Sequence, residues 1–479
     1  MKVLFLIPPS LDGKPVAERI FGCNYGVYPQ DNIFILYPAT ILKNKGHDVM
    51  CLDFPVLHKK KQDFIKFCRF NSFDIVVIYT VFLSKKTDLM ARDFIRAANN
   101  KTRFIYIGTE PTAYPEDFIE DDTIVIRGES ELSIVEVVDA IAGTYLPLEG
   151  VSGVSFCKQG KVIHNKGCGI IDNLDVLPFP DRSLFGNRRY YNPKLGSYPF
   201  TTMVTSRGCS FRCYYCVPHS LDFAREIEYK LNNDMAKPPV RLRSPANIIE
   251  EFRMLVELGY RAVSFIDDQF VWGGERTKAI CDGIKDLGIE WSCLARADTL
   301  VDYDVVKAMA DAGCKLVAMG IESFDQRILD YINKGCKKDI FYMAIENLKK
   351  ASIGIEFNIL IGSCPLETRQ TIYDTYREVV RLKPDYVLFS ICTPFPHTDF
   401  YLKAKQNGWM SKPEYEAVDP TKKALVSYPH LMDKELERII RILYLRYYFR
   451  LSFLLGKVLK LRGLRDMVNK VRAAATIFK

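Results

Sequence analysis

Short apolar segments alternate with longer amphipathic segments along this 479-residue chain, in two separate series. The first series predicts a helix at Tyr37–Lys45, a closing helix at Glu131–Ile141, and strands at Lys2–Ile7, Asp48–Leu52, Asp74–Val81, Phe104–Ile107 and Thr123–Ile126. Strands that alternate with helices predict a doubly wound parallel sheet. Ligands of such sheets lie beyond the carboxyl ends of the strands.

The second series predicts six further strands, at Thr201–Thr205, Ala262–Ile266, Trp291–Ala295, Lys315–Met319, Glu356–Ile361 and Tyr386–Ile391. Six strand–helix units favour a partial βα barrel, with its chemistry at the carboxyl ends of the strands. Between the two series, Gly150–His164 is typical of a β-hairpin and Leu174–Arg182 of a Pro-stiffened linker. The sequence therefore predicts an α/β protein with four parts: a doubly wound domain at 1–145, a hairpin and linker at 146–195, a barrel at 196–410 and a helical tail at 411–479.

Composition places the chain among globular proteins, with 48% hydrophobic and 26% charged residues. The apolar stretch at the start of the chain is too short for a signal peptide, and the longest apolar run, Ile75–Leu83, is far too short for a membrane span. We therefore expect a reducing, cytoplasmic location, where clustered cysteines among the 14 in the chain indicate metal.

Basic charge is concentrated in the tail. From Leu431 to Lys479 there are 12 Lys and Arg and 4 Asp and Glu, a net charge of +8, which equals that of the whole chain. Two apolar stripes at helical spacing, Leu436–Tyr447 and Leu451–Leu461, run through this region. Basic amphipathic helices lie on anionic membrane surfaces, so the tail predicts a peripheral contact with the inner face of the membrane. The alternative is a helix packed on the barrel with its charges in water.

The first strand of the second series runs directly into three closely spaced cysteines, Cys209, Cys213 and Cys216. Three thiolates at this spacing can surround a cube of iron and sulfur and leave one iron open. A structural zinc site would need a fourth ligand, for which His219 is the only near candidate. From the residues alone, we expect a 4Fe–4S cluster with an open iron at the end of a strand.

This spacing, with the aromatic Tyr215 before the third cysteine, resembles that of the radical S-adenosylmethionine (SAM) superfamily. The resemblance implies that the open iron chelates SAM and that one electron cleaves SAM to methionine and a 5′-deoxyadenosyl radical. That radical then abstracts hydrogen from an unactivated carbon. The barrel positions the substrate and excludes water.

Later strand ends are similar to other parts of the same family pattern. The resemblance implies that Tyr215, Asp267, Asp268, Arg296, Glu322 and Ser323 line the SAM site. In this assignment, Asp267 and Asp268 receive the SAM amino group and Arg296 meets the carboxylate or ribose. The segment Gly320–Ser323 is similar to the family's ribose-side motif. The loop Gly362–Thr368 resembles the family's Pro-Gly-Glu-Thr loop, except that Leu366 replaces the glycine, and Thr393–Thr398 resembles the loop that follows the sixth strand.

The first domain resembles the one that precedes the barrel in cobalamin-dependent radical SAM enzymes, and the resemblance covers about residues 1–410. Those enzymes include methyltransferases and the cyclases of chlorophyll and hopanoid pathways, and their cobalamin lies between the two domains. The resemblance implies cobalamin contacts at the strand ends, namely Pro9, Ser10, Gly108, Thr109, Glu110, Gly128 and Glu129. The chain lacks the Asp-x-His-x-x-Gly signature around His47 and His58, so we expect no histidine on cobalt.

The leading functional hypothesis is cobalamin-dependent C-methylation, or rearrangement or cyclisation, of a lipid-like or tetrapyrrole-like substrate. Three alternatives remain open: a radical SAM enzyme whose first domain is a scaffold without cobalamin, an RNA methylthiotransferase, and a non-catalytic corrin-binding module. The methylthiotransferase would need a second cysteine triad, whereas Cys23, Cys51 and Cys68 are scattered, and the binding module would not need the first triad. The expected partners are a small-molecule or lipid-like substrate and an electron donor such as a flavodoxin or ferredoxin, with no nucleic acid.

Overall fold

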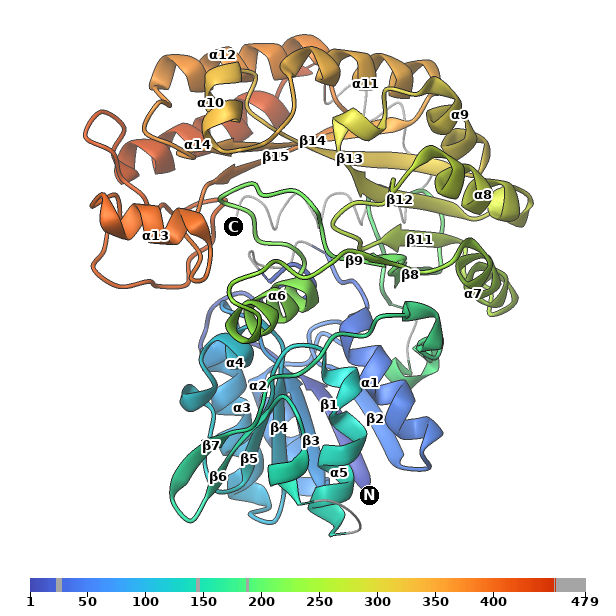
Figure 1. Cartoon of the computed structure of the whole chain (residues 1–479), viewed down its shortest axis with the longest axis vertical. Helices are drawn as coiled ribbons and strands as arrows, with labels where there is room; N and C mark the ends of the chain where they lie inside the picture. Colours follow the sequence, from blue (N-terminus) through green and yellow to red (C-terminus); the bar gives the residue numbers. More distant parts are fainter. Residues whose placement is uncertain (23–27, 144–146, 187–188, 452, 454–479) are drawn as a thin grey trace. The chain divides into compact units, whose positions relative to one another are not determined.

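The computed structural model describes residues 1–22, 28–143, 147–186, 189–451 and 453, and divides the chain into two units. The first comprises Met1–Tyr190 and Pro218–Arg243, and the second comprises Tyr191–Val217 with the chain from Ser244 onward. These boundaries differ from the expected 145 and 195, because the hairpin belongs to the first unit and so does the segment that follows the cysteine motif. Each unit is described separately below (Figure 1).

The first unit contains a seven-stranded sheet in the order β2-β1-β3-β4-β5-β6-β7. Pairing is parallel from β2 to β5 and antiparallel for β6 and β7, so the hairpin extends the sheet. The strands are β1 Lys2–Ile7, β2 Asp48–Asp53, β3 Ile75–Tyr79, β4 Arg103–Ile107, β5 Thr123–Ile126, β6 Val154–Lys158 and β7 Lys161–His164, with β10 at Arg241–Leu242. The helices are α1 Ile33–Asn44, α2 Lys61–Phe70, α3 Lys85–Ala98, α4 Thr109–Ala113, α5 Ile134–Ala142 and α6 Ser220–Asn232.

The composition and burial of strand β3 are those of a sheet covered on both faces. All five of its residues are buried, and four of them are Ile or Val, as expected for a central strand of a parallel sheet. Helix α1 packs beside α5, and α2 packs beside α3. Helix α1 begins where the Asn32 side chain accepts the backbone N–H groups of Phe34 and Ile35 at 3.0 and 3.3 Å. The doubly wound fold expected from the sequence is confirmed.

The second unit is a curved parallel sheet of six strands in the order β8-β11-β12-β13-β14-β15. The strands are β8 Phe200–Met203, β11 Ala262–Phe265, β12 Glu290–Ala295, β13 Cys314–Glu322, β14 Gly354–Ile361 and β15 Tyr386–Ile391, with a short β9 at Ser206–Arg207. The helices are α7 Pro245–Glu257, α8 Gly274–Ile284, α9 Tyr303–Asp311, α10 Gln326–Tyr331, α11 Lys338–Lys350, α12 Arg369–Leu382, α13 Asp399–Gln406 and α14 Asp433–Tyr448. The order confirms the expected partial barrel, whose edges are β8 and β15.

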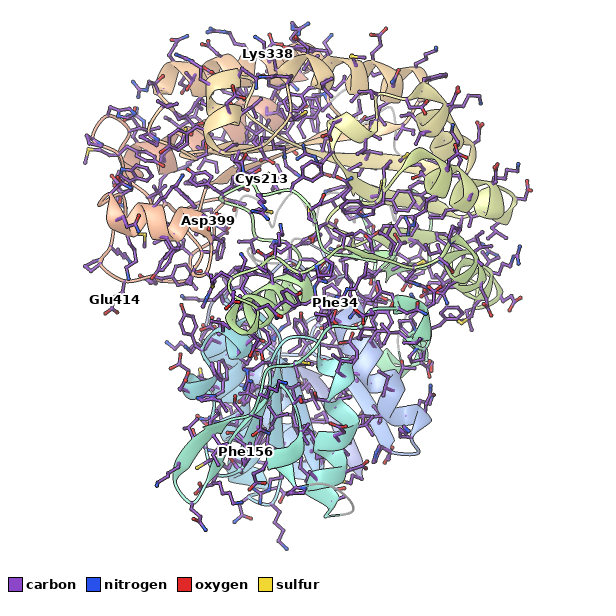
Figure 2. All side chains as sticks on the ribbon, viewed as in Figure 1. Phe34, Phe156, Cys213, Lys338, Asp399 and Glu414 are labelled. Carbon is purple, nitrogen blue, oxygen red and sulfur yellow. The ribbon has the colours of Figure 1, made fainter. Side chains whose placement is uncertain are left out.

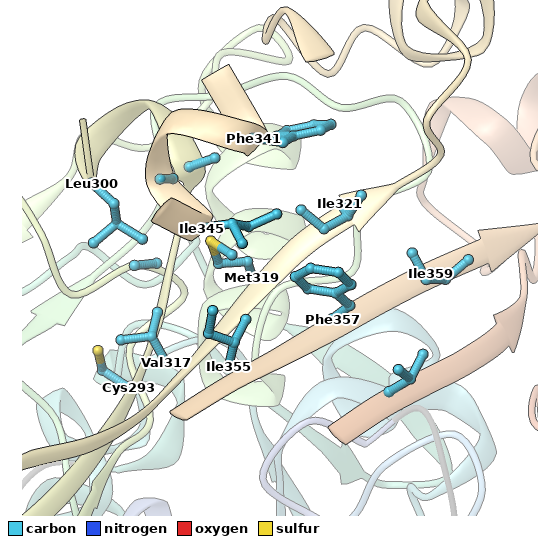
Figure 3. Close-up of a cluster of buried hydrophobic side chains, with 14 of the residues drawn as sticks. Cys293, Leu300, Val317, Met319, Ile321, Phe341, Ile345, Ile355, Phe357 and Ile359 are labelled. Carbon is cyan, nitrogen blue, oxygen red and sulfur yellow. The ribbon is translucent and has the colours of Figure 1, made fainter. Parts of the chain in front are cut away.

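The main core of the second unit lies between the sheet and its outer helices (Figure 1). Alternate side chains of β13 and β14 point toward α11 and pack with Phe341 and Ile345, as Figure 3 shows. The other side chains of these strands point to the inner face, which carries smaller and polar residues such as Ala318, Gly320 and Asn358. This alternation follows from the two-residue period of a strand. Within the described residues, no helix is both long and apolar enough to cross a bilayer.

The first apolar stripe of the tail belongs to this core. Helix α14 carries Leu436, Ile439, Ile440, Leu443 and Tyr447, each at most 1% exposed. The hypothesis that this stripe lies in a membrane interface is therefore wrong, because its apolar side chains are buried within the second unit. The second stripe, Leu451–Leu461, lies outside the described residues except for Leu451 and Phe453.

Candidate functional site

The three cysteines of the motif stand on one short loop that follows β9. Cys209 and Cys213 are half-buried and Cys216 is exposed (Cys213 is labelled in Figure 2). The N–H group of Cys216 donates to the carbonyl oxygen of Cys213 at 3.1 Å, which closes a turn between the second and third cysteines. Three accessible thiols on one turn fit a cluster that takes three protein ligands and keeps one iron open.

Hydrogen bonds on both sides of Cys213 hold this loop to the segment after α10. The Asn333 side chain donates to the carbonyl oxygen of Arg212 at 2.7 Å, and the N–H group of Tyr214 donates to the carbonyl oxygen of Ile332 at 3.2 Å. Tyr214 is itself buried, and its hydroxyl group donates to the carbonyl oxygen of Ser363. The backbone on both sides of Cys213 is therefore held by contacts within the barrel.

Arg296, which the resemblance assigned to SAM, supports the same loop. Its guanidinium carbon lies 3.4 Å from the centre of the Phe211 ring, and its fork pairs with Asp298 at 2.9 Å. It also donates to the carbonyl oxygens of Lys334 and Gly335 at 3.1 and 3.3 Å. Burial lowers the pKa of Arg296, but Asp298 outweighs it and raises that pKa above its ordinary value.

Glu322 and Lys334 form a buried ion pair at the end of β13. Their side chains are 9% and 8% exposed, and Nζ of Lys334 lies 3.0 Å from Oε1 of Glu322. The register of β13 shifts between Gly320 and Glu322, and Glu322 has the left-handed φ of +64°. Gly320 lies beneath the pair, where a Cβ atom would come within 2.8 Å of Nζ and 2.5 Å of Oε1, so a side chain there would displace the two charged groups.

Tyr215 connects this ion pair to the cysteines. Its side chain is half-buried, and its pKa is raised well above its ordinary value by burial and by the nearby Glu322 and Cys213. Glu322 therefore lies near Tyr215 and pairs with Lys334. Of the residues predicted for the SAM site, Tyr215 and Glu322 are the two that the structure brings directly together.

Asp267 and Ser323, also predicted for the SAM site, have hydrogen-bond partners within the barrel. Asp267 is completely buried and accepts the N–H groups of Thr205 and Ser206 at 2.6 and 3.0 Å, as well as the Thr205 hydroxyl group. Burial raises its pKa against the lowering effect of these bonds. Asp268 is half-buried beside it. Ser323 is buried and lies 3.3 Å from the hydroxyl group of Thr375 on α12, while it accepts the N–H group of Asp325.

Lys334, Asn333, Phe211 and Asp298 are the site residues that sequence reasoning missed. A signal existed at Asn333-Lys334-Gly335, because Asn and Gly around a helix end indicate left-handed backbone, and the φ values are +54° and +60°. The pairing of Lys334 with Glu322 could not have been found in this way, since it joins residues on either side of α10. His219, the only candidate for a fourth ligand, is buried in the first unit, where its ring lies 2.9 Å from Asp222.

Most of the predicted cobalamin residues hydrogen-bond or pair within the first unit. Ser10 donates to the carbonyl oxygen of Lys14 at 2.6 Å, and Thr109 donates to that of Ser220 at 2.9 Å. Glu129 pairs with Arg241 at 2.8 Å. Pro9 and Gly128 are buried, and a Cβ atom at Gly128 would lie 3.3 Å from the Glu228 side chain.

Gly108 has a structural reason to be glycine. Its φ is +104°, and a Cβ atom there would lie 2.6 Å from the carbonyl oxygen of Thr80, which directly follows the neighbouring strand β3. Its neighbour Glu110 is 5% exposed and pairs with Lys85 at 3.1 Å, and burial raises the pKa of its carboxyl group to about 7.

Two buried polar atoms at this edge remain without a hydrogen-bond partner among the described residues. They are Oγ1 of Thr80 and Oε2 of Glu110, and the residues adjoin, because the Glu110 N–H group donates to the Thr80 carbonyl oxygen at 3.3 Å. Unfilled hydrogen-bonding capacity at buried atoms is expected where water or a polar ligand completes a site. These two atoms could therefore hydrogen-bond to a polar ligand.

Comparison with known proteins agrees with this site. Residues 203–379 match the model of the radical SAM superfamily. The chain is 28% identical to an uncharacterised methyltransferase of Pyrococcus horikoshii, over 97% of this chain and 96% of that protein. It is 26% identical to the anaerobic magnesium-protoporphyrin IX monomethyl ester cyclase of Rubrivivax gelatinosus, over 60% of this chain, and spans half the length of that cyclase.

Among solved structures, the chain is similar to the cobalamin-dependent S-adenosylmethionine radical enzyme OxsB, determined with aqua-cobalamin and S-adenosylmethionine bound. The TM-score is 0.70 at 15% identity, and the match covers all of this chain and 72% of OxsB. At this identity the likeness shows a shared fold.

Proposed function

Because residues 203–379 form a radical SAM domain, we propose that this chain is an enzyme that modifies an unactivated carbon by C-methylation or cyclisation. The observation that carries the proposal is the cysteine loop, whose three thiols are accessible while its backbone is held by Ile332 and Asn333. A 4Fe–4S cluster at Cys209, Cys213 and Cys216 would supply the electron for reductive cleavage of SAM.

The chain's own residues prepare the surroundings of that cluster. Arg296 holds the loop through Phe211, and Glu322 presents a carboxylate whose position is set by Lys334 and Tyr215. A buried carboxylate beside the cluster is suited to the ammonium group of SAM, because charge-assisted hydrogen bonds are stronger than neutral ones. We assign SAM contacts to Glu322 and Tyr215. We assign to Asp267 the role of holding the segment after β8 to the end of β11.

The methylation form of the proposal includes cobalamin in the first unit. It is supported by the full-length similarity to a methyltransferase and by the shared fold with a cobalamin enzyme. Thr80 and Glu110 would contact the amide side chains of the corrin, and none of the predicted contact residues is a histidine. Cobalamin would supply methyl transfer to the substrate.

The cyclisation form is the second candidate, and similarity to the Rubrivivax cyclase favours it. Methyl transfer from cobalamin is not needed in this form. The two forms differ in the fate of the SAM methyl group, which reaches the product only in methylation.

The test uses full-length protein reconstituted anaerobically with iron, sulfide and cobalamin. With a strong reductant and SAM, the wild type should release 5′-deoxyadenosine, and the variant with all three cysteines changed to Ala should release none. Equal release by that variant would overturn the cluster assignment. Gel filtration and the visible spectrum should show a retained corrin that is five-coordinate or water-ligated. If no corrin is retained, the methylation form fails and the cyclisation form stands.

The proposal includes two partners, an electron donor of the flavodoxin or ferredoxin class and a membrane surface. With the first stripe buried in α14, the membrane contact rests on residues 451–479, which hold seven Lys and Arg and one Asp. Each basic residue near an anionic leaflet contributes about 1 kcal/mol of binding, and salt weakens this attraction. A surface-bound enzyme would meet a lipid-like or tetrapyrrole-like substrate there.

A further inference from the structure

We propose that Lys334 is a positioning residue that sets the reduction potential of the cluster through its positive charge beside Cys213. This inference rests on the cluster of the proposed function and adds a residue that neither the motif nor the family model assigns. It concerns how readily the cluster accepts its one electron from the donor protein.

The first argument is the burial of the charge. The Lys334 side chain is 8% exposed, and among the described residues its ion-pair partner is Glu322, at 3.0 Å. Water screens a charge poorly in such a place, so its field reaches neighbouring groups at much greater strength than from the surface. The Glu322 carboxylate beside it favours the charged form of Lys334.

The second argument is the rigid connection between Lys334 and the cysteine loop. The two residues before Lys334 bind the two residues on either side of Cys213, through Asn333 to Arg212 and Ile332 to Tyr214. Arg296 also holds the carbonyl oxygen of Lys334. The ammonium group therefore has a fixed place relative to Cys213, set by backbone contacts and by the absence of a side chain at Gly320.

The third argument is the direction of the electrostatic effect. The potential of an iron–sulfur cluster depends on nearby charge, on hydrogen bonds and on solvent exposure. Reduction adds a negative charge, so the Lys334 cation should stabilise the reduced cluster and raise its potential. Glu322 should have the opposite effect, although its charge is partly neutralised by Lys334.

The experiment measures the potential by redox titration of the reconstituted full-length protein, with the EPR signal of the reduced cluster as readout and without SAM. At a fixed solution potential, Lys334→Met should lower the ratio of reduced to oxidised cluster about tenfold. This corresponds to a reduction potential lowered by about 59 mV for a one-electron couple. Lys334→Arg should keep the wild-type ratio, and Glu322→Gln should raise it. A loosened loop would shift the reduction potential of both variants in the same direction. Opposite shifts for Lys334→Met and Glu322→Gln therefore indicate an effect of charge.

Lys194→Met is the matched control. Lys194 also pairs with a buried glutamate, Glu356 at 2.6 Å, but this pair lies toward the amino-terminal end of β14, whereas Glu322 lies at the carboxyl end of β13. Its loss should leave the potential unchanged. An unchanged potential in Lys334→Met with a full cluster overturns the inference and leaves the proposed function standing. If that variant takes up no iron, Glu322→Gln decides alone, and an unchanged ratio there overturns the inference. A wild type without any cluster spectrum would instead overturn the proposed function.

Discussion

At the scale of single residues, the cysteine loop is held by side chains from three later parts of the barrel. Arg296 follows β12, Glu322 ends β13, and Asn333 and Lys334 follow α10. Arg296 and Asn333 contact the loop at Phe211 and Arg212, and Lys334 pairs with Glu322. Such supporting contacts orient metal ligands and tune the metal they bind.

Arg296 is expected to affect the cluster as well as SAM. Arg296→Ala removes the stacking on Phe211 and the hydrogen bonds to two carbonyl oxygens, interactions that contribute about 1 kcal/mol each. Iron retained against a competing chelator should therefore fall by about tenfold. Arg296→Lys keeps the positive charge but loses the planar guanidinium group. Its iron retention should lie between that of the wild type and that of Arg296→Ala. Full iron retention with weakened SAM affinity would mean that Arg296 serves SAM alone.

Glu367 gives the barrel a pH-dependent stability. It is 2% exposed in the loop after β14, and burial raises the pKa of its carboxyl group to about 7, although hydrogen bonds from Ser363 and Gly362 act to lower it. The folded state therefore holds this proton more tightly than the unfolded state. Stability from this group is present below the ordinary value of 4.5 and is lost as pH rises through about 7, by about 3 kcal/mol.

Glu367→Gln should remove this loss. Thermal unfolding between pH 4.5 and 8 should show the variant gaining stability relative to the wild type as pH rises. The exposed Glu346→Gln on α11 is the control and should give a constant difference. Parallel curves for Glu367→Gln and the wild type would contradict the assignment.

At the scale of elements, α14 protects the open edge of the barrel. Among the described residues, β15 is the last strand of the sheet, and its outward N–H and C=O groups have no further strand to pair with there. The hydroxyl group of Tyr444 bonds to both N and O of Phe389, at 3.1 and 2.8 Å, and that of Tyr448 bonds to N and O of Val387, at 3.1 and 2.7 Å. Two tyrosines thus take the place of a seventh strand, which blocks edge-to-edge pairing.

The double variant Tyr444→Phe and Tyr448→Phe tests how much these hydrogen bonds stabilise the barrel. Each lost hydroxyl group leaves buried backbone groups unpaired, at a cost of about 1–3 kcal/mol. The midpoint of thermal unfolding should fall, and the variant should aggregate sooner on heating. Tyr303→Phe, a half-buried tyrosine at the start of α9, should have little effect, and an equal loss there would show that the edge is not specifically protected.

At the scale of the whole molecule, the basic end separates into a structural part and a charged part. Residues 431–450 contain α14 and pack on the barrel, whereas residues 451–479 carry a net charge of +6. Stability should depend on the first part and attraction to membranes on the second.

Two truncations test this division. A chain that ends at Phe453, which packs against Tyr447 and Tyr448, should keep the wild-type unfolding midpoint but should no longer sediment with anionic vesicles at low salt. A chain that ends at Met432 should unfold or precipitate, because the core loses the buried stripe of α14. Intact protein that ignores anionic vesicles would contradict the membrane proposal, and a stable chain ending at Met432 would contradict the structural role.

The sequence by itself determined the two strand–helix series, the order of the barrel strands and the cysteine triad, because apolar periodicity and ligand spacing are local properties. Only the tertiary structure decided which partners these residues meet. Asp267 is used to join two strands, α14 is buried and not on a surface, and Lys334 reaches Glu322 across a strand bulge. These three features depend on contacts between residues far apart in the chain or on a left-handed backbone position. The spacing of residue types along the sequence predicts neither of these causes.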